Sequence, residues 1–307
     1  RRADDELVAS MRRAGASVAV VRARRPRDLP TMALGDLAYA RNARVAAVEG
    51  IEAHAPRAVV YSTTTAGALW PRPGAIRFDA PSAGNRPARH GIWQRPVERR
   101  RLGEATLLLP WSGGGLAEAP GRHAEAVVVP VPVEPSGRPP AERDIAAITY
   151  GAHPEKKGLD RVVRAWRAVR RPGETLVVAG VDSGGEGDGV VYRGLLAPDE
   201  YRALLRRARL YVTAPRREDY GIAQLEALAD GCLLVTTPAP GPYAAAPLAR
   251  ALDPRTVTDD LATAIRAALD DPVAGYQERA LALLAPYRRT TVDAVVAERV
   301  LPALLGH

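Results

Sequence analysis

Hydrophobic and polar positions alternate along the chain between two patterns. Short apolar runs such as 145–150 and 210–213 indicate buried strands, whereas longer amphipathic stretches such as 36–54 and 159–170 indicate helices. This alternation predicts parallel sheets with helices on both faces. The predicted strands are 17–21, 58–62, 106–109, 145–150, 175–180, 190–192, 210–213 and 233–236. The predicted helices are 4–14, 36–54, 97–103, 159–170, 198–207, 222–230, 261–269 and 291–305.

A proline-rich segment divides this pattern into two halves. Residues 130–143 hold five prolines and few apolar side chains, which is typical of a linker. We therefore expect two successive Rossmann-like domains, 1–134 and 135–307. The last helix, about 288–305, is a candidate to pack back onto the first domain. The first strand of the N-terminal domain is expected to be missing from the chain as given.

Composition narrows the class of protein. The 307 residues are 47% hydrophobic and 25% charged, as in a globular enzyme, and hold no apolar run long enough to span a membrane. The charged start predicts that there is no signal peptide. The single cysteine, Cys232, excludes an internal disulfide and a cysteine-based metal cluster. It fits a reducing cytoplasm, where we expect the protein to work.

The net charge of +8 favours anionic partners. Nucleic acid is not expected among them, because no helix-turn-helix, RRM or zinc pattern is visible. Arg95, Arg99, Arg100 and Arg101 are candidates for a peripheral contact with the inner face of a membrane. The alternative is that these arginines simply form the solvent-exposed face of a helix.

Lysine is rare in this chain and stands at one place. Of 43 basic residues only two are lysines, and they are adjacent, at Lys156 and Lys157. An ammonium is a compact charge that binds phosphate, and a guanidinium does not replace it everywhere. Both lysines lie in the segment 150–158, between a predicted strand and a predicted helix, where Gly158 allows close backbone approach. A helix N-terminus adds N–H groups and partial positive charge, so the segment predicts a phosphate site, although not a Walker A loop.

A second polar loop, 215–221, follows the predicted strand 210–213. It carries Glu218, and Glu226 falls beside the apolar stripe of the next predicted helix. A carboxylate in such a place needs hydrogen bonds, and the hydroxyls of a sugar or ribose can donate them. The alternative is that both glutamates pair with nearby arginines such as Arg217.

These two loops carry a family resemblance. Residues 218–232 resemble the E-x7-E signature of the retaining GT-B glycosyltransferases of family 4, and 156–160 resembles their K-G-x-D segment. The resemblance is specific over about 145–240 and diffuse over about 55–115. It implies an α/β protein of the GT-B fold, with two Rossmann-like domains facing a central cleft.

The resemblance also implies a role for each matching residue. Lys157 would contact the donor diphosphate and stabilise charge on the leaving group, and Glu218 would bind hydroxyls of the donor sugar. Glu226 would bind the nucleotide ribose. The other donor-binding candidates are Lys156, Gly158, His153, Arg217, Tyr220, Gly221 and Ile222. We expect neither a metal nor another cofactor, because fixed positive charge can stabilise the leaving diphosphate.

The implied activity is hexosyl transfer from a UDP- or GDP-sugar to a glycan, a lipid-linked molecule or a small molecule, with retention of configuration. Asp79, Asn85 and His90, between a predicted strand and a predicted helix, are the acceptor-side candidates. A GT-B epimerase stays open, and so does a non-catalytic nucleotide-sugar-binding protein, because 150–153 lacks the family's Arg and 240–245 lacks its Glu. A phosphorylase is disfavoured because it would need a lysine to hold pyridoxal phosphate, and the only two lysines of the chain lie in the predicted phosphate site.

Overall fold

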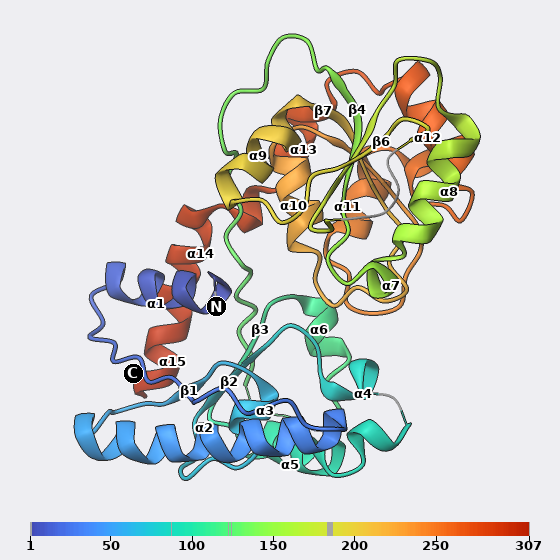
Figure 1. The fold of residues 1–307 in the computed structure, drawn as a ribbon. Coiled ribbons are helices and arrows are strands. Elements are labelled where there is room, and N and C mark those ends of the chain that lie inside the picture. The colour runs from blue at the N-terminus through green and yellow to red at the C-terminus, as the bar shows by residue number, and fades with distance from the viewer. Residues whose placement is uncertain (1, 87, 122, 124, 183–186, 307) are drawn as a thin grey trace. The chain divides into compact units, whose positions relative to one another are not determined.

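The computed structural model describes residues 2–86, 88–121, 123, 125–182 and 187–306. By its contacts the chain divides into two compact units, each with its own parallel sheet (Figure 1). Unit 1 comprises Arg1–Pro132 and Arg289–His307, and unit 2 comprises Val133–Arg288. The described residues contain no helix that is both long enough and apolar enough to cross a membrane.

Unit 1 is built on a sheet of three parallel strands in the order β1-β2-β3. These strands are β1 (Val60–Tyr61), β2 (Ala75–Phe78) and β3 (Leu108–Pro110). Its helices before the proline-rich segment are α1 (Arg2–Arg13), α2 (Met32–His54), α3 (Thr64–Gly67), α4 (Ser82–Asn85), η1 (Ala88–Gly91), α5 (Gln94–Glu104) and α6 (Gly113–Ala117). The chain returns to this unit as α14 (Arg289–Val295), η4 (Val296–Val300) and α15 (Leu301–Leu305).

The returning C-terminal segment is part of the core of unit 1. Val292, Val296 and Val300 are buried in one cluster with Leu7 and Met11 of α1. On the rim of this cluster the carboxylate of Asp293 accepts hydrogen bonds from Ser10 and Arg13 of α1, at 2.6 and 2.7 Å. Helices α1 and α14 are therefore held side by side, although they are far apart in the sequence (Figure 1).

Unit 2 is a doubly wound parallel sheet in the order β6-β5-β4-β7-β8. Its strands are β4 (Ile145–Tyr150), β5 (Leu176–Ala179), β6 (Val190–Tyr192), β7 (Ala208–Thr213) and β8 (Leu233–Thr236). Its helices are α7 (Pro154–Lys157), α8 (Leu159–Val169), α9 (Pro198–Arg207), α10 (Ile222–Ala229), α11 (Ala245–Leu252), η2 (Pro254–Thr256), α12 (Leu261–Asp270), α13 (Tyr276–Leu283) and η3 (Ala285–Tyr287). Helices α8 and α12 pack together on one face of the sheet, and α9 and α10 on the other (Figure 1).

The strand order of unit 2 fixes where a ligand can bind. The chain runs outward from β4 to β5 and β6, and then returns to place β7 on the opposite side of β4. The direction of winding thus changes between β4 and β7. In open parallel sheets, ligands bind outside the carboxyl ends of the strands at such a point.

Most of the predicted elements are confirmed, and those of unit 2 agree best. The strands 145–150, 190–192 and 233–236 and the helix 198–207 have the expected bounds. Each is either a continuous apolar run or an amphipathic stretch with a proline at its first position, which are strong local signals.

The predicted buried strand at 17–21 is wrong. Residues 16–29 have no regular structure, and Val20 and Val21 are 49% and 47% exposed. A strand needs a hydrogen-bonded neighbour. This segment instead lies along α2, where a Cβ placed on Gly50 would come within 2.8 Å of Cγ1 of Val21.

Strand β2 was not predicted from the sequence. Arg77 interrupts its apolar pattern, yet this side chain is only 1% exposed and lies over the ring of Trp111, with its guanidinium carbon 5.4 Å from the ring centroid. Because a strand prediction relies on apolar residues at interior positions, a buried arginine hides the strand from it. Helices α11 and α13 were also missed.

Candidate functional site

The two loops singled out in the sequence meet at the carboxyl ends of the adjacent strands β4 and β7. The backbone N–H of Arg216 donates to the carbonyl of Lys156 at 3.0 Å. Gly158 makes this contact possible: its φ is +62°, and a Cβ there would lie 1.9 Å from the carbonyl oxygen of Ala214. Only glycine combines this left-handed conformation with so close an approach.

Lys157 and Glu218 are in direct contact. The ammonium Nζ of Lys157 lies 2.7 Å from Oε2 of Glu218, which also accepts a hydrogen bond from the Gln224 amide at 2.9 Å. The Glu218 side chain is 6% exposed and that of Lys157 is 22% exposed. The structure therefore joins the lysine and the glutamate that the sequence assigned to the two ends of one sugar donor.

A second ion pair lies next to the first. Lys156 pairs with Asp219 at 2.9 Å, and Arg217 holds the other oxygen of Asp219 at 2.7 Å. Burial by itself raises the pKa of Asp219, but the hydrogen bonds and charges of Lys156 and Arg217 outweigh it and hold this pKa below its usual value. Arg217, the arginine offered as a partner for Glu218 or Glu226, contacts the carboxylate of Asp219 at 2.7 Å.

The remaining donor-side candidates form the backbone around these pairs. His153 is exposed, has a φ of 58°, and accepts the N–H of Lys157 at 3.0 Å through its carbonyl. Gly221 has a φ of +92° and precedes Ile222, the first residue of α10. The carbonyl of Tyr220 accepts the N–H of Ala244 at 3.0 Å.

The loop after β8 supports the glutamate loop through its backbone. The N–H of Glu218 donates to the carbonyl of Pro240 at 3.1 Å. A Cβ on Gly241, whose φ is +104°, would lie 2.4 Å from the carbonyl oxygen of Glu218. Segment 240–245 therefore contacts the site through its main chain and has no carboxylate of its own.

Glu226 lies in a different set of contacts. This side chain, 5% exposed, is 3.4 Å from Nη1 of Arg202 on α9. The same arginine binds Asp230 at 2.6 Å and the carbonyl of Glu134 at 2.7 Å, and Ser136 donates to Asp230. Arg202 is thus a charge partner of Glu226 in a buried network that ties α9 and α10 to the start of unit 2.

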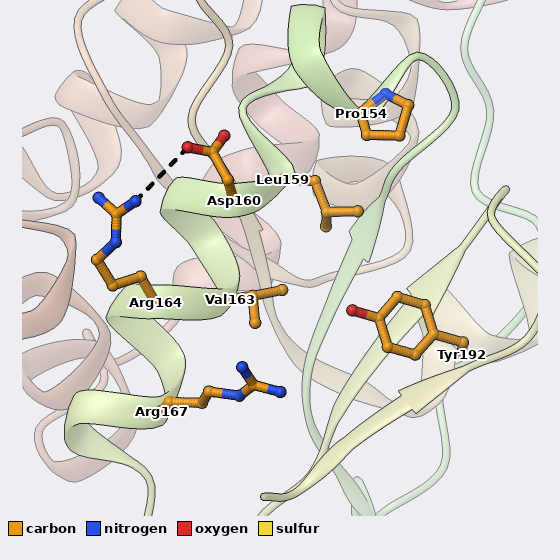
Figure 2. A pocket seen from close by; sticks show the side chains of 7 residues that line it. All are labelled: Pro154, Leu159, Asp160, Val163, Arg164, Arg167 and Tyr192. Atoms are coloured by element: carbon orange, nitrogen blue, oxygen red, sulfur yellow. Dashed lines mark ion pairs between the residues drawn. The ribbon is translucent and has the colours of Figure 1, made fainter. Parts of the chain in front are cut away.

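A cavity of about 450 Å³ lies beside the loop 150–158, on the side of α8 that faces β6 (Figure 2). Pro154, Leu159 and Val163 line it together with Tyr192 of β6. Asp160 and Arg164 form an ion pair of 3.8 Å at its edge. Neither Lys157 nor Glu218 lines this cavity, so it is distinct from the paired charges of the two loops.

Unit 1 has a cavity of about 310 Å³ at the carboxyl ends of β1 and β2. Two acceptor-side candidates, Asp79 and Asn85, line it. The third, His90, is exposed on η1 and is not part of the lining. Within the described residues, no group of three or more His, Cys, Asp or Glu side chains has an arrangement that could hold a metal ion.

Sequence reasoning missed Gln224, Arg202 and Gly241. Gln224 lies two positions before Glu226, within the E-x7-E segment, and its amide is an evident donor for a buried carboxylate. Arg202 comes from another helix, and it carries no local signal that separates it from the other arginines of the chain.

Comparison with known proteins agrees with this architecture. Residues 144–271, all within unit 2, match the family described as "Glycosyl transferases group 1". No curated protein sequence matches the chain. The family match covers both charged loops and supports a glycosyltransferase.

Solved structures resemble the chain over nearly its whole length. Sucrose-phosphate synthase from Thermosynechococcus elongatus has a TM-score of 0.73 at 15% identity, covering 94% of this chain and 83% of that one. The lipopolysaccharide-biosynthesis glycosyltransferase WaaG has a TM-score of 0.72 at 15% identity, covering 100% and 96%. An E. coli trehalose-6-phosphate protein bound with UDP-2-fluoro glucose has a TM-score of 0.65 at 12% identity, covering 89% and 78%. The fold is therefore that of the GT-B glycosyltransferases, as the sequence predicted.

Proposed function

We propose that this protein is a retaining glycosyltransferase that moves a hexosyl group from a UDP- or GDP-sugar to the hydroxyl of a glycan, a lipid-linked molecule or a small molecule. The observation that carries the proposal is the 2.7 Å contact between Lys157 and Glu218 at the point where the sheet of unit 2 changes its winding. The family match over 144–271 and a structural neighbour bound to a UDP-sugar analogue support the donor class.

The two side chains suit the two ends of such a donor. During transfer the bond between the anomeric carbon and the diphosphate oxygen breaks, the acceptor oxygen bonds to that carbon, and the acceptor proton passes to the departing diphosphate oxygen. The diphosphate gains negative charge, which the ammonium of Lys157 stabilises. The carboxylate of Glu218 accepts hydrogen bonds from hydroxyls of the sugar. In our proposal the fixed positive charge stabilises the leaving diphosphate without a metal or another cofactor.

Before the donor binds, these two charges neutralise one another. We propose that the diphosphate takes the place of Glu218 beside Lys157, and that sugar hydroxyls then satisfy the released carboxylate. The Gln224 amide, 2.9 Å from Oε2, holds Glu218 in position through this exchange. Lys156 and Arg217 keep Asp219 from competing for Lys157, because both already bind it.

Glu226 has the role of a ribose ligand in this proposal. Its carboxylate is oriented by Arg202 at 3.4 Å. The ribose hydroxyls would donate to this carboxylate, and a charged acceptor makes such hydrogen bonds strong. Arg202 is then a positioning residue.

The test is release of nucleoside diphosphate from UDP- and GDP-sugars by the purified full chain. Lys157→Ala and Glu218→Gln should each slow this release by at least tenfold, because each removes a charge that contacts the donor. Arg164→Ala is the matched control: this arginine is on α8 in the same unit, its side chain is 78% exposed, and it is outside the paired loops. Donor binding without release would favour a non-catalytic nucleotide-sugar-binding protein, and equal rates in Lys157→Ala and the parent would refute the assignment of Lys157.

We further propose a peripheral contact between unit 1 and an anionic membrane surface, with the reaction taking place in the cytoplasm. Arg99 and Arg100 of α5 are exposed and carry the proposal, whereas Arg95 and Arg101 donate to backbone carbonyls of the unit. Sedimentation with vesicles of anionic phospholipid should fall with added salt and with Arg99→Ala/Arg100→Ala. Binding that is equal on neutral vesicles would contradict it.

A further inference from the structure

The cavity of unit 1 is lined almost entirely by groups that make hydrogen bonds. It lies where β1 and β2 end, at the edge of a parallel sheet where ligands bind. Its volume of about 310 Å³ is at the lower end of the range for small-molecule sites, about 300–1,000 Å³. Its lining residues are Asp36, Tyr39, Thr63, Thr64, Thr65, Phe78, Asp79, Ala80, Ser82, Asn85, Arg86 and Gln94.

One lining side chain has a polar atom without a partner. Gln94 is 2% exposed, and its Nε2 donates to Oγ1 of Thr65 at 2.7 Å. Its Oε1 is buried and has no hydrogen-bond partner among the described residues. Exchanging the amide oxygen and nitrogen does not remove the problem, because one polar atom still faces the unpartnered position. A buried amide atom without a partner costs free energy, which a ligand hydroxyl can recover by donating to it or accepting from it.

The described lining of the cavity carries more negative than positive charge. Among the lining residues that the structure describes, the one cation is Arg86, which Asp36 holds in a two-pronged contact at 2.7 and 3.2 Å. Asp79 adds a further carboxylate to the wall. Below the wall, the buried Glu98 accepts from both the N–H and the hydroxyl of Ser82, at 2.9 Å each. An anionic ligand would meet an excess of negative charge, and would have to separate Arg86 from Asp36 to find a cation.

We propose that this cavity binds an uncharged polyhydroxylated molecule, that is a sugar without phosphate, and that the side-chain amide of Gln94 hydrogen-bonds one of its hydroxyls. The threonines and Ser82 supply hydroxyls that both donate and accept, which suits the mixed needs of sugar hydroxyls. The Asp36–Arg86 pair excludes phosphorylated sugars by occupying the cation they need. That the bound sugar is the acceptor of the transferase rests on the proposed function, whereas the binding itself does not.

The experiment uses the full chain labelled with 15N and measures binding of neutral mono- and disaccharides, and of glucose 6-phosphate, without any nucleotide sugar. A neutral sugar of the panel should shift the side-chain amide resonance of Gln94 and bind at least tenfold more tightly than glucose 6-phosphate. Gln94→Leu, which keeps the bulk but removes the amide, should weaken this binding about tenfold. The matched control is Asn42→Leu, which removes an amide from α2 outside the cavity, where Nδ2 donates to the carbonyl of Arg24.

A second variant tests the charge argument separately. Asp36→Asn removes the carboxylate that holds Arg86 and should raise the affinity for glucose 6-phosphate about tenfold. Tighter binding of glucose 6-phosphate than of every neutral sugar by the parent protein would overturn the proposal, and so would the absence of any neutral sugar that shifts Gln94. Neutral-sugar binding without release of nucleoside diphosphate in the donor assay would leave this inference standing and remove the proposed function. Release of nucleoside diphosphate without binding of any neutral sugar would remove this inference and leave the proposed function standing.

Discussion

The ion pair between Lys157 and Glu218 allows an asymmetric prediction about stability. Lys157→Met leaves a carboxylate that is 6% exposed with the neutral Gln224 amide at 2.9 Å, whereas Glu218→Gln leaves an ammonium that is 22% exposed and reaches water. An unpaired buried charge costs about 3–5 kcal/mol. We expect Lys157→Met to lower the free energy of unfolding of unit 2 by about 3 kcal/mol, and Glu218→Gln to lower it by about 1 kcal/mol because water replaces the partner.

The coupling between the two side chains follows from their distance. Two unit charges 2.7 Å apart attract by about 6 kcal/mol at an effective dielectric constant of about 20. Desolvation of both groups offsets much of this, which leaves a coupling free energy of about 2–3 kcal/mol. The double variant Lys157→Met/Glu218→Gln should therefore be more stable than Lys157→Met alone.

Urea unfolding of the parent, the two single variants and the double variant measures this coupling. Trp166 is the one tryptophan in the sequence of unit 2 and is fully buried, so its 19F resonance in protein labelled with fluorotryptophan reports on this unit by itself. Trp166→Phe assigns the resonance. A coupling free energy indistinguishable from zero would refute the ion pair. Equal effects of the two single variants would refute the argument from the difference in burial.

Three further predictions concern the same unit. Gly158→Ala should lower the free energy of unfolding by about 3 kcal/mol or more and abolish donor binding in calorimetry, because its Cβ would lie 1.9 Å from the Ala214 carbonyl at a φ of +62°. Burial raises the pKa of the Cys232 thiol to about 12, so alkylation by iodoacetamide at pH 8 should be slow in folded protein and fast in urea; rapid labelling without urea would contradict the buried position. The pKa of Asp219 is held below its ordinary 3.8, so its contribution is present above that pH and is lost as pH falls through the folded pKa. Asp219→Asn should cost about 1 kcal/mol at pH 7, a value reduced because the Lys156 side chain is 48% exposed, and a loss that persists unchanged at pH 2 would disprove this linkage.

The sequence was most informative where each local pattern coincided with a complete structural element. Strand β4 is a continuous apolar run, and α9 begins with a proline and ends in basic residues, so each could be bounded from its own residues. The loops that carry Lys157 and Glu218 were found for the same reason. Each follows a recognisable strand and contains residue types that are unusual in their surroundings.

Residues whose state depends on distant neighbours could not be predicted in this way. Val20 and Val21 have the composition of a strand, but they pair with no strand and remain half exposed beside α2. Arg77 has the character of a surface residue, but it is buried within β2 against Trp111. Hydrogen-bond partners for a strand and a ring for a guanidinium come from elsewhere in the chain, so a local pattern does not contain them.

The sequence by itself determined the alternation of strands and helices, the GT-B fold class and the two loops that hold the candidate donor site. Only the tertiary structure decided which charges are neighbours: Lys157 with Glu218, Lys156 with Asp219, and Glu226 with Arg202. The physical reason is that periodicity is a property of consecutive residues, whereas an ion pair depends on distances between segments that are far apart in sequence. For the two lysine pairs, those distances are fixed by the parallel pairing of β4 with β7 and by the glycine that lets their loops touch.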